Sequence, residues 1–297
     1  MLKQDLAEPR EITEAMLREW PLPEPQGDKY DRGGVLIVGG SAQTPGAVLL
    51  AGIAALRSGA GRLQLAVAES TAAGLAISVP EAMVIALEED SSNGAVKADA
   101  AEALAEMLHG ADAVCLGPGL FESPADPGFS IRVLELLNDG SRVVIDAYSL
   151  GELAENGREH IARTKAVLTP NAKEVARLLK IDVPESRAER AKAARAAAEE
   201  FRACVLMHAY VATPAGGLWM EPEADVGLGT SGSGDVLAGL VAGLLARGAD
   251  PAQAGVWATH THALAGQRLG PIGYLARELL DEIPDALAQV TDGTWSS

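Results

Sequence analysis

The sequence GTSGSGD at residues 229–235 leads directly into the apolar run VLAGLVAGLLA at residues 236–246, and no charged side chain follows until Arg247. Glycines and hydroxyl residues before a long apolar run predict a loop that opens a buried helix. The backbone N–H groups of such a loop and the positive end of the helix dipole favour an anion such as phosphate. The alternative is a plain turn with Asp235 as the helix N-cap.

Asp235 is the unusual member of this loop, because a carboxylate repels a bound phosphate. It therefore needs a task of its own, and three are open at this point. It can cap the helix, help to hold a metal, or take a proton from a nucleophilic hydroxyl group.

The composition restricts the class of protein. The 297 residues are 48% hydrophobic but only 4% aromatic, so aliphatic side chains must build the core. The net charge of −17 argues against nucleic acid or an anionic membrane as the main partner, since both bind basic surfaces. Anionic small molecules remain compatible with this charge, because local N–H groups or a metal can hold them.

Cysteine usage and the apolar runs predict a cytoplasmic protein. Cys115 and Cys204 each lie in an apolar run, which favours buried free thiols in a reducing compartment. The first residues, MLKQD, lack the apolar segment of a secretory signal. The apolar runs contain glycines and fall short of the roughly 18 residues that a membrane helix needs.

Strand and helix patterns alternate along most of the chain. Residues 34–38 predict a strand that ends in a glycine turn, 46–59 a buried helix and 61–68 a second strand, which together make one βαβ unit. Further strands are predicted at 113–116, 143–145, 166–168 and 204–207, and helices at 98–109, 187–201, 251–269 and 274–289. We therefore expect an α/β fold with a mostly parallel sheet covered by helices on both faces.

The domain organisation follows from the same patterns. Residues 1–28 are polar and rich in proline, with one short helical pattern at residues 12–20, and predict an N-terminal arm. Residues 29–297 show no repeat, linker or shift of composition, so we expect a single catalytic domain. The glycine turn after the first strand lacks the GxGxxG spacing, and no P-loop motif is present.

Several polar side chains follow predicted strands or open predicted helices: Ser41, Asp146, Asn171, Glu174 and Asp235. Because parallel strands end at one edge of a sheet, these residues are expected to converge. Asn171 and Glu174 suit Mg²⁺ with its water shell, but their spacing equally predicts a capping box. Asp146 is either functional or a turn residue. His260 and His262 point in different directions on one helix and are interpreted as residues of the helix surface or the core edge.

The ordered motifs resemble the ribokinase-like superfamily, which is marked by a G-x-G-D loop, here residues 232–235, and an upstream N-x-x-E motif, here residues 171–174. Within it the chain resembles the NAD(P)H-hydrate dehydratases. Their further motifs run in order from about residue 29 to the C-terminus: KYDRG at 29–33, VGGS at 38–41, PGA at 45–47, AALRSGAG at 54–61, PEAMV at 80–84, GPGL at 117–120, IDA at 145–147, LTP at 168–170 and DVLAG at 235–239. The resemblance implies a ribokinase-like three-layer sandwich.

The resemblance also implies a reaction. NADH and NADPH are damaged when water adds across the 5,6 double bond of the nicotinamide ring. Enzymes of this family reverse the damage with ADP or ATP, by phosphorylating the ring hydroxyl and then eliminating phosphate. We therefore expect hydrated NADH or NADPH and ADP or ATP as ligands, Mg²⁺ as cofactor, and a homo-oligomer, since family members often form tetramers.

The implied roles fall on specific residues. Asp235 is the general base, and the backbone at Gly232, Ser233 and Gly234 stabilises the transferred phosphoryl group. Residues that receive the hydrated dinucleotide, besides Asp235, are Gly40, Ser41, Ala47, Gly119 and Asn171. Residues that contact ADP or ATP are Met207, His208, Thr230 and Gly234. Glu174, with Asn171, organises Mg²⁺ through water, and Asp146 is a further candidate.

The chain departs from the family pattern at four places. A Lys-Gly pair that commonly touches the nucleotide is replaced by Met207-His208, so the cationic contact is missing unless His208 supplies it. An acidic residue often found two places after Asp146 is Tyr148. The usual first glycine of the anion loop is Ser231, and the histidine common after the Thr-Pro pair is Asn171.

Two other functions compete with the dehydratase. One is an alcohol kinase of the same fold that acts on a thiazole or pyrimidine substrate, and residues 29–61 favour the dehydratase over it. The other is a nucleotide-binding protein without turnover, suggested by the missing lysine. The presence of Asp235 argues against a mere binder, which has no use for a carboxylate beside phosphate.

Overall fold

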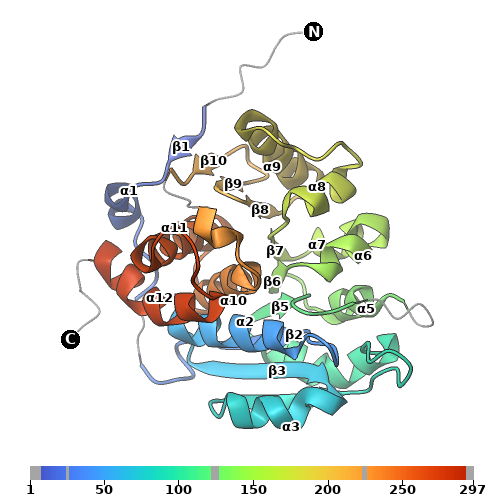
Figure 1. The fold of residues 1–297 in the computed structure, drawn as a ribbon. Coiled ribbons are helices and arrows are strands. Elements are labelled where there is room, and N and C mark those ends of the chain that lie inside the picture. The colour runs from blue at the N-terminus through green and yellow to red at the C-terminus, as the bar shows by residue number, and fades with distance from the viewer. Residues whose placement is uncertain (1–7, 25–26, 122–126, 223–225, 292–297) are drawn as a thin grey trace.

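A ten-stranded sheet runs through the computed structural model, which describes residues 8–24, 27–121, 127–222 and 226–291 (Figure 1). The strand order is β1-β10-β9-β8-β7-β6-β5-β2-β3-β4. The strands are β1 (Arg10–Glu11), β2 (Gly34–Val38), β3 (Arg62–Ala68), β4 (Ala82–Leu87), β5 (Ala113–Leu116), β6 (Arg142–Ile145), β7 (Lys165–Leu168), β8 (Cys204–Met207), β9 (Tyr210–Ala212) and β10 (Leu218–Met220). Strand β9 is antiparallel to both neighbours, and every other neighbouring pair is parallel.

The middle of the sheet contains its topological switch point. From β2 the chain moves outward to β3 and β4, then returns to β5 on the other side of β2 and continues outward to β8. Val35 of β2 pairs with Leu63 on one side and with Ala113 on the other. The connections that follow β2 and β5 therefore run in opposite directions along the sheet, and open α/β sheets bind ligands at the carboxyl ends of strands at such a point.

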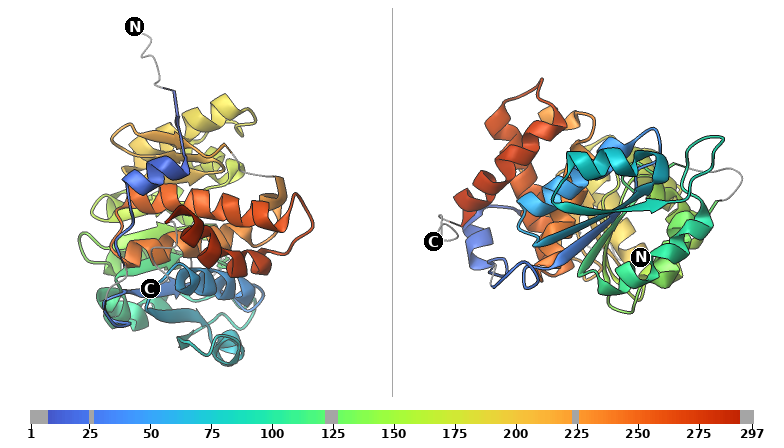
Figure 2. Two further views of the ribbon diagram at one scale, coloured as in Figure 1. Left: turned by 90° about the vertical axis from the view of Figure 1, so that its left-hand side faces the viewer. Right: turned by 90° about the horizontal axis from the view of Figure 1, so that it is seen from below.

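Helices cover both faces of the sheet, and Figure 2 shows α11 and α12 on one side and α5 on the other. The first layer holds α1 (Glu14–Glu19), α2 (Pro45–Arg57), α3 (Glu69–Ser78), α10 (Ser233–Ala246), α11 (Pro251–Leu269) and α12 (Ala276–Val290). The second holds the 3₁₀ helix η1 (Ala98–Leu104), α4 (Ala105–Gly110), α5 (Phe129–Leu136), α6 (Tyr148–Asn156), α7 (Arg158–Ile161), α8 (Ala172–Leu179) and α9 (Arg187–Phe201). A second 3₁₀ helix, η2 (Val226–Gly229), precedes α10. The predicted three-layer arrangement, a mostly parallel sheet covered by helices on both faces, is thus confirmed.

Helix α10 lies at the centre of the first layer, as its uninterrupted apolar sequence predicts. It packs against α2 at very short range. A Cβ atom placed on Gly239 would lie 2.0 Å from the carbonyl oxygen of Ala51, so only glycine allows the two backbones to approach this closely. This contact fixes the N-terminus of α10 relative to the turn that follows β2.

The N-terminal segment, residues 10–23, forms a strap across the first helix layer. Its strand β1 pairs with β10, and Leu17 of α1 is fully buried. The Trp20 ring stacks on Trp219 with centroids 6.1 Å apart. The Trp20 carbonyl oxygen accepts a hydrogen bond of 2.9 Å from Nε1 of Trp257. Residues 1–7 and 25–26 of the expected arm lie outside the described residues.

Most predicted elements are confirmed, and three expectations need correction or addition. The segment predicted as one amphipathic helix at 98–109 begins as the 3₁₀ helix η1 before it continues as α4. Elements α3, β4, α5, α6 and α7 were not predicted. His260 and His262 are both buried, so the prediction that they lie on the helix surface is wrong. Nδ1 of His260 lies 2.8 Å from a carboxylate oxygen of Glu221.

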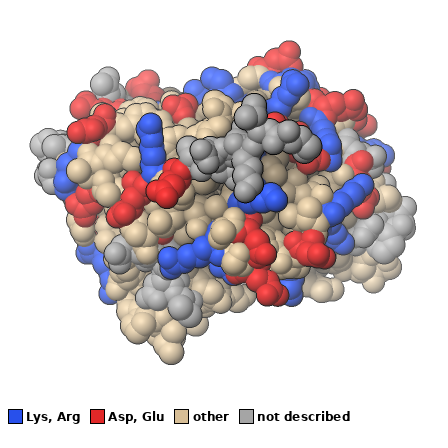
Figure 3. All heavy atoms as spheres, turned by 90° about the horizontal axis from the view of Figure 1, so that it is seen from above, with Lys and Arg blue, Asp and Glu red and all other residues tan. Residues whose placement is uncertain are grey.

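The described surface carries charges of both signs (Figure 3), and the two cysteines are buried. No helix in the described ranges combines the length and apolar character that crossing a membrane requires. On the face shown in Figure 3, basic and acidic side chains are interspersed among the described residues. Cys115 and Cys204 are buried free thiols, as their apolar surroundings predict.

Candidate active site

The turns that follow β2 and β5 interlock at the switch point. Ser41 N–H donates to the carbonyl oxygen of Gly119 (2.9 Å), and the Thr44 hydroxyl donates to the same oxygen (2.7 Å). A Cβ atom on Gly119 would lie 2.9 Å from Cβ of Ala47 and 3.4 Å from Cα of Gly40. The structure thus brings together the four residues Gly40, Ser41, Ala47 and Gly119. Thr44 is a further member of this cluster that was not predicted from the sequence, and its hydroxyl also hydrogen-bonds the Ser41 hydroxyl (2.7 Å).

The anion loop sits beside this cluster, at the start of α10. Gly232 is the N-cap of α10 and has φ = 90°, a left-handed conformation that favours glycine. A Cβ atom on it would lie 2.7 Å from Leu50 of α2, one turn after Ala47. Because Gly232 has no side chain, no side-chain cap covers the helix N-terminus, where N–H groups and the helix dipole attract anions.

Asp235 occupies the first turn of α10, so the alternative that it is the N-cap is wrong. One of its carboxylate oxygens lies 3.9 Å from the Cβ position of Gly232, on the side of the anion loop. Partial burial raises the pKa of Asp235 from its ordinary value to about 6. A carboxylate with this pKa is still ionised near neutral pH and is a stronger proton acceptor than an ordinary aspartate.

Asp146 is a buried carboxyl group at the end of β6, next to β5 in the sheet. Burial raises its pKa to about 7, and the negative charges of Asp235 and Glu174 add to the rise. The Thr169 hydroxyl opposes it by donating a hydrogen bond of 2.7 Å to the carboxyl group. The negative charges of Asp235 and Glu174 thus both reach the carboxyl group of Asp146.

The backbone after Asp146 is strained. Ala147 has φ = 50° and ψ = −124°, a conformation that residues with a side chain rarely adopt. Such strain persists only where the surroundings enforce it, and it gathers at functional sites. This favours the functional interpretation of Asp146 over that of a plain turn residue. The sequence carried no signal for the strain, because alanine is not typical of such positions.

Asn171 and Glu174 form the capping box that their spacing predicts as one alternative. The Asn171 side-chain oxygen accepts from the N–H groups of Lys173 (2.9 Å) and Glu174 (3.0 Å). Glu174 Oε2 accepts in turn from the N–H of Asn171 (2.8 Å). Partial burial raises the pKa of Glu174. The box engages one of the two carboxylate oxygens of Glu174.

The side chains present fit a cation that is held through water. Within the described ranges, no group of three or more His, Cys, Asp and Glu side chains is close enough to ligate a metal directly. Carboxylates whose charges raise the pKa of the neighbouring Asp146 are nevertheless a favourable environment for a divalent cation, which relieves the repulsion.

The residues expected to bind the nucleotide lie at the same sheet edge, but Met207 can contribute only its backbone. The side chain of Met207 is fully buried in the second layer's core, so only its backbone can face a ligand. His208 begins the two-residue turn between β8 and β9, with φ = 52°. Partial burial and the charge of Arg190 lower its pKa, so its ring is neutral near pH 7. Thr230 donates to the carbonyl oxygen of Tyr274 before α12 (3.4 Å).

Comparisons with known proteins all indicate the same family. A family model described as NAD(P)H-hydrate dehydratase matches residues 35–285. A protein from Xanthomonas campestris pv. campestris, named ADP-dependent (S)-NAD(P)H-hydrate dehydratase, is 43% identical over 291 residues, covering 96% of this chain and 98% of that protein. A bifunctional NAD(P)H-hydrate repair enzyme from Salinibacter ruber is 37% identical over 94% of this chain, which spans 53% of that longer protein.

A solved structure agrees with these relatives. The ADP/ATP-dependent NAD(P)H-hydrate dehydratase from Bacillus subtilis, co-crystallised with ATP/Mg²⁺, superimposes with a TM-score of 0.81 at 26% identity. The match covers 96% of this chain and 99% of that one.

Proposed function

The chain belongs to the NAD(P)H-hydrate dehydratase family, and from that premise we propose that Asp235 is the general base in dehydrating hydrated NADH and NADPH, with ADP as the phosphate donor. One observation carries the assignment. Asp235 lies half-buried in the first turn of α10, with a raised pKa, beside an uncapped helix N-terminus that suits phosphate. The donor in the name of the Xanthomonas relative is ADP, while ATP was present in the Bacillus crystals.

The first step is phosphoryl transfer to the ring hydroxyl. The carboxylate of Asp235 takes the hydroxyl proton as the oxygen attacks the terminal phosphorus of ADP, and the bond to the leaving AMP breaks. The backbone at the start of α10 would stabilise the charge that develops on the transferred group, through the N–H of Gly234 above all, because the N–H of Ser233 already donates to the carbonyl oxygen of Thr230 (3.3 Å). A general base in such a step contributes about 10²–10⁴-fold to the rate.

The second step is elimination. The ring nitrogen donates its electron pair into the ring, the C–O bond to phosphate breaks, and the neighbouring carbon loses a proton to restore the double bond. The sum is hydrated NADH plus ADP giving NADH, AMP and phosphate. The ring nitrogen drives this step, so the site needs no further strong acid.

We assign the remaining roles with the geometry as support. The interlocked turns with Gly40, Ser41, Ala47 and Gly119 line the switch point and receive the hydrated dinucleotide. We assign Glu174 to hold Mg²⁺ through water, and Asn171 to orient Glu174, since two N–H groups already engage the Asn171 oxygen. Mg²⁺, when bound, supplies neutralising charge for the phosphates of the donor.

The nucleotide donor would then lie over Thr230, Gly234 and the backbone at Met207 and His208. A neutral His208 in place of the lysine common in the family removes one positive charge from this region. We therefore expect weaker donor binding than in relatives that carry the lysine.

The deciding assay follows the absorbance of the reduced nicotinamide. The protein is incubated with hydrated NADH, Mg²⁺ and either ADP or ATP. Recovery of NADH with ADP, accompanied by AMP and phosphate in equal amounts, is the expected result. A lasting phosphorylated product without NADH would instead identify an alcohol kinase. Absence of both products with either donor would leave a nucleotide-binding protein and refute the proposal.

A further inference from the structure

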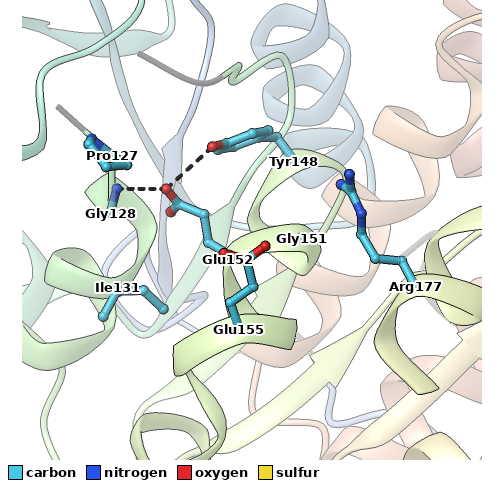
Figure 4. Close-up of a pocket in the computed structure, with 8 residues that line it drawn as sticks. All are labelled: Pro127, Gly128, Ile131, Tyr148, Gly151, Glu152, Glu155 and Arg177. Carbon is cyan, nitrogen blue, oxygen red and sulfur yellow. Dashed lines mark hydrogen bonds between the residues drawn. The ribbon is translucent and has the colours of Figure 1, made fainter. Parts of the chain in front are cut away.

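A groove of about 280 Å³ lies beside the site, between α5, α6 and α8 (Figure 4). Helix α6 begins at Tyr148, two residues after Asp146, and α8 begins directly after Asn171. The groove is therefore built from the same two helices whose first residues border the reacting centre. A long ligand held at Asp235 and Asn171 can extend along these helices into it.

Two acidic side chains line the groove, Glu152 and Glu155 (Figure 4), and Glu152 is already engaged by hydrogen bonds. One carboxylate oxygen of Glu152 accepts from the N–H of Gly128 (2.8 Å) and from the hydroxyl of Tyr148 (3.5 Å). The other oxygen accepts from the N–H of Ser130 (2.8 Å). These N–H groups belong to the N-terminus of α5, so the helix dipole offsets the charge of Glu152. Glu152 thus shapes one wall and does not neutralise a neighbouring cation.

Arg177 supplies the positive charge of the groove. Its side chain extends from α8 to the side of α6 (Figure 4), where a Cβ atom on Gly151 would lie 3.1 Å from the guanidinium nitrogen Nη1. Among the residues that the structure describes, no carboxylate comes within 4.0 Å of this guanidinium. In a chain with a net charge of −17, Arg177 is thus a cation lining a concave site without an acidic partner.

An unpaired guanidinium is suited to phosphate, whose oxygens it can bind in a bidentate manner. The hydrated dinucleotide carries phosphate at two places: the pyrophosphate, present in both forms, and the 2′-phosphate, present only in hydrated NADPH. We propose that Arg177 binds a phosphate group of the hydrated dinucleotide in this groove. The inference rests on the proposed function, because that function identifies the long phosphate-bearing substrate.

The test compares Arg177→Gln with the wild type on hydrated NADPH and on hydrated NADH. Loss of a charged hydrogen bond predicts a KM for hydrated NADPH about tenfold higher or more, with kcat at saturation and KM for ADP unchanged. A rise confined to the NADPH form identifies the 2′-phosphate, and an equal rise for both forms identifies the pyrophosphate. Unchanged KM values for both forms, or a rise in KM for ADP alone, overturn the proposal.

A matched control is Lys192→Gln, which removes the same charge from an exposed position on α9 outside the groove and should leave every KM unchanged. Thermal unfolding of both variants confirms that each is folded.

Equilibrium binding of NADPH and NADH separates this inference from the proposed function. If the wild type shows no turnover but Arg177→Gln weakens NADPH binding about tenfold, the phosphate site at Arg177 is supported and the dehydratase function is refuted. If the wild type turns over while the variant binds and reacts normally, only the groove is wrong. A wild type that neither turns over nor binds NADPH refutes both.

Discussion

At the scale of single residues, Asp235 sets how the reaction depends on pH. Only the ionised carboxylate accepts the hydroxyl proton, and its pKa is raised to about 6. We therefore expect kcat/KM to be flat above about pH 7 and to fall tenfold per pH unit well below 6. The measurement is a pH profile with hydrated NADH and saturating ADP. A midpoint near 4, the ordinary value of an aspartate, would show that the pKa of Asp235 is not raised in the working enzyme.

Removing this carboxylate gives the second prediction. Asp235→Asn keeps the size and polarity of the side chain but cannot take a proton, so kcat should fall by about 10²–10⁴-fold while the protein stays folded. The remaining rate should also lose the pH dependence near 6. A kcat close to that of the wild type would remove Asp235 from the role of base.

Asp146 gives a prediction about stability. Its pKa is raised to about 7 in the folded protein, against 3.8 for an unperturbed aspartate, so the unfolded state loses this proton at lower pH than the folded state. The unfolding free energy therefore falls as pH rises from about 4 to 7, by at most on the order of 4 kcal/mol. Asp146→Asn should have a higher Tm than the wild type at pH 8 and a similar Tm near pH 4. A lower Tm at pH 8 would mean that the ionised carboxylate has a stabilising partner.

At the scale of elements, the α2–α10 contact determines where the anion loop sits. Gly239→Ala would place a methyl group 2.0 Å from the Ala51 carbonyl oxygen, so the helices must separate. Overpacking of this kind costs about 1–3 kcal/mol, and the shift should also reduce kcat. The matched control is Gly74→Ala in α3, where an added Cβ meets no atom within 4 Å. That variant should gain about 0.4–1 kcal/mol. Equal unfolding free energies for the two variants would show that the α2–α10 contact at Gly239 does not require glycine.

The elements that could be predicted from the sequence are those with strong local signals. Residues 34–38 and 187–201 were predicted with the bounds that β2 and α9 have, because continuous apolar residues or an alanine-rich run define them. Helix α3 and strand β4 were missed, since α3 has only one buried residue and β4, at the sheet edge, is only partly buried. Partial burial leaves no clear periodicity to detect.

In the site, too, local patterns could be predicted from the sequence and long-range contacts could not. The anion loop and the Asn171–Glu174 capping box are local patterns, and the sequence contains them whole. The convergence of Asp146 with Asp235, the link between Thr44 and Gly119, and the groove at Arg177 depend on strand order and on helices far apart in the chain. No local spacing specifies which strands are neighbours, so these features could not be predicted in detail.

At the scale of the whole molecule, the N-terminal strap is packed into the first helix layer, and we expect it to unfold together with the rest in one cooperative transition. Leu17→Ala removes a fully buried side chain from the strap and should lower the unfolding free energy by about 2–5 kcal/mol. Activity at 25 °C should be retained, because Leu17 is outside the site. A separate early transition for the strap would contradict this integration. The homo-oligomer expected from the family is a further prediction, which sedimentation velocity can measure.

The stacking of Trp20 on Trp219, with Trp257 hydrogen-bonded to the Trp20 backbone, makes the strap visible to spectroscopy. Three of the chain's four tryptophans gather where the strap meets the sheet and α11. Intrinsic fluorescence excited near 295 nm therefore reports mainly on strap docking, whereas NADH formed by the reaction emits on excitation near 340 nm. Two fluorescence signals can thus be recorded from one sample: tryptophan emission for the docking of the strap, and NADH emission for the repaired product.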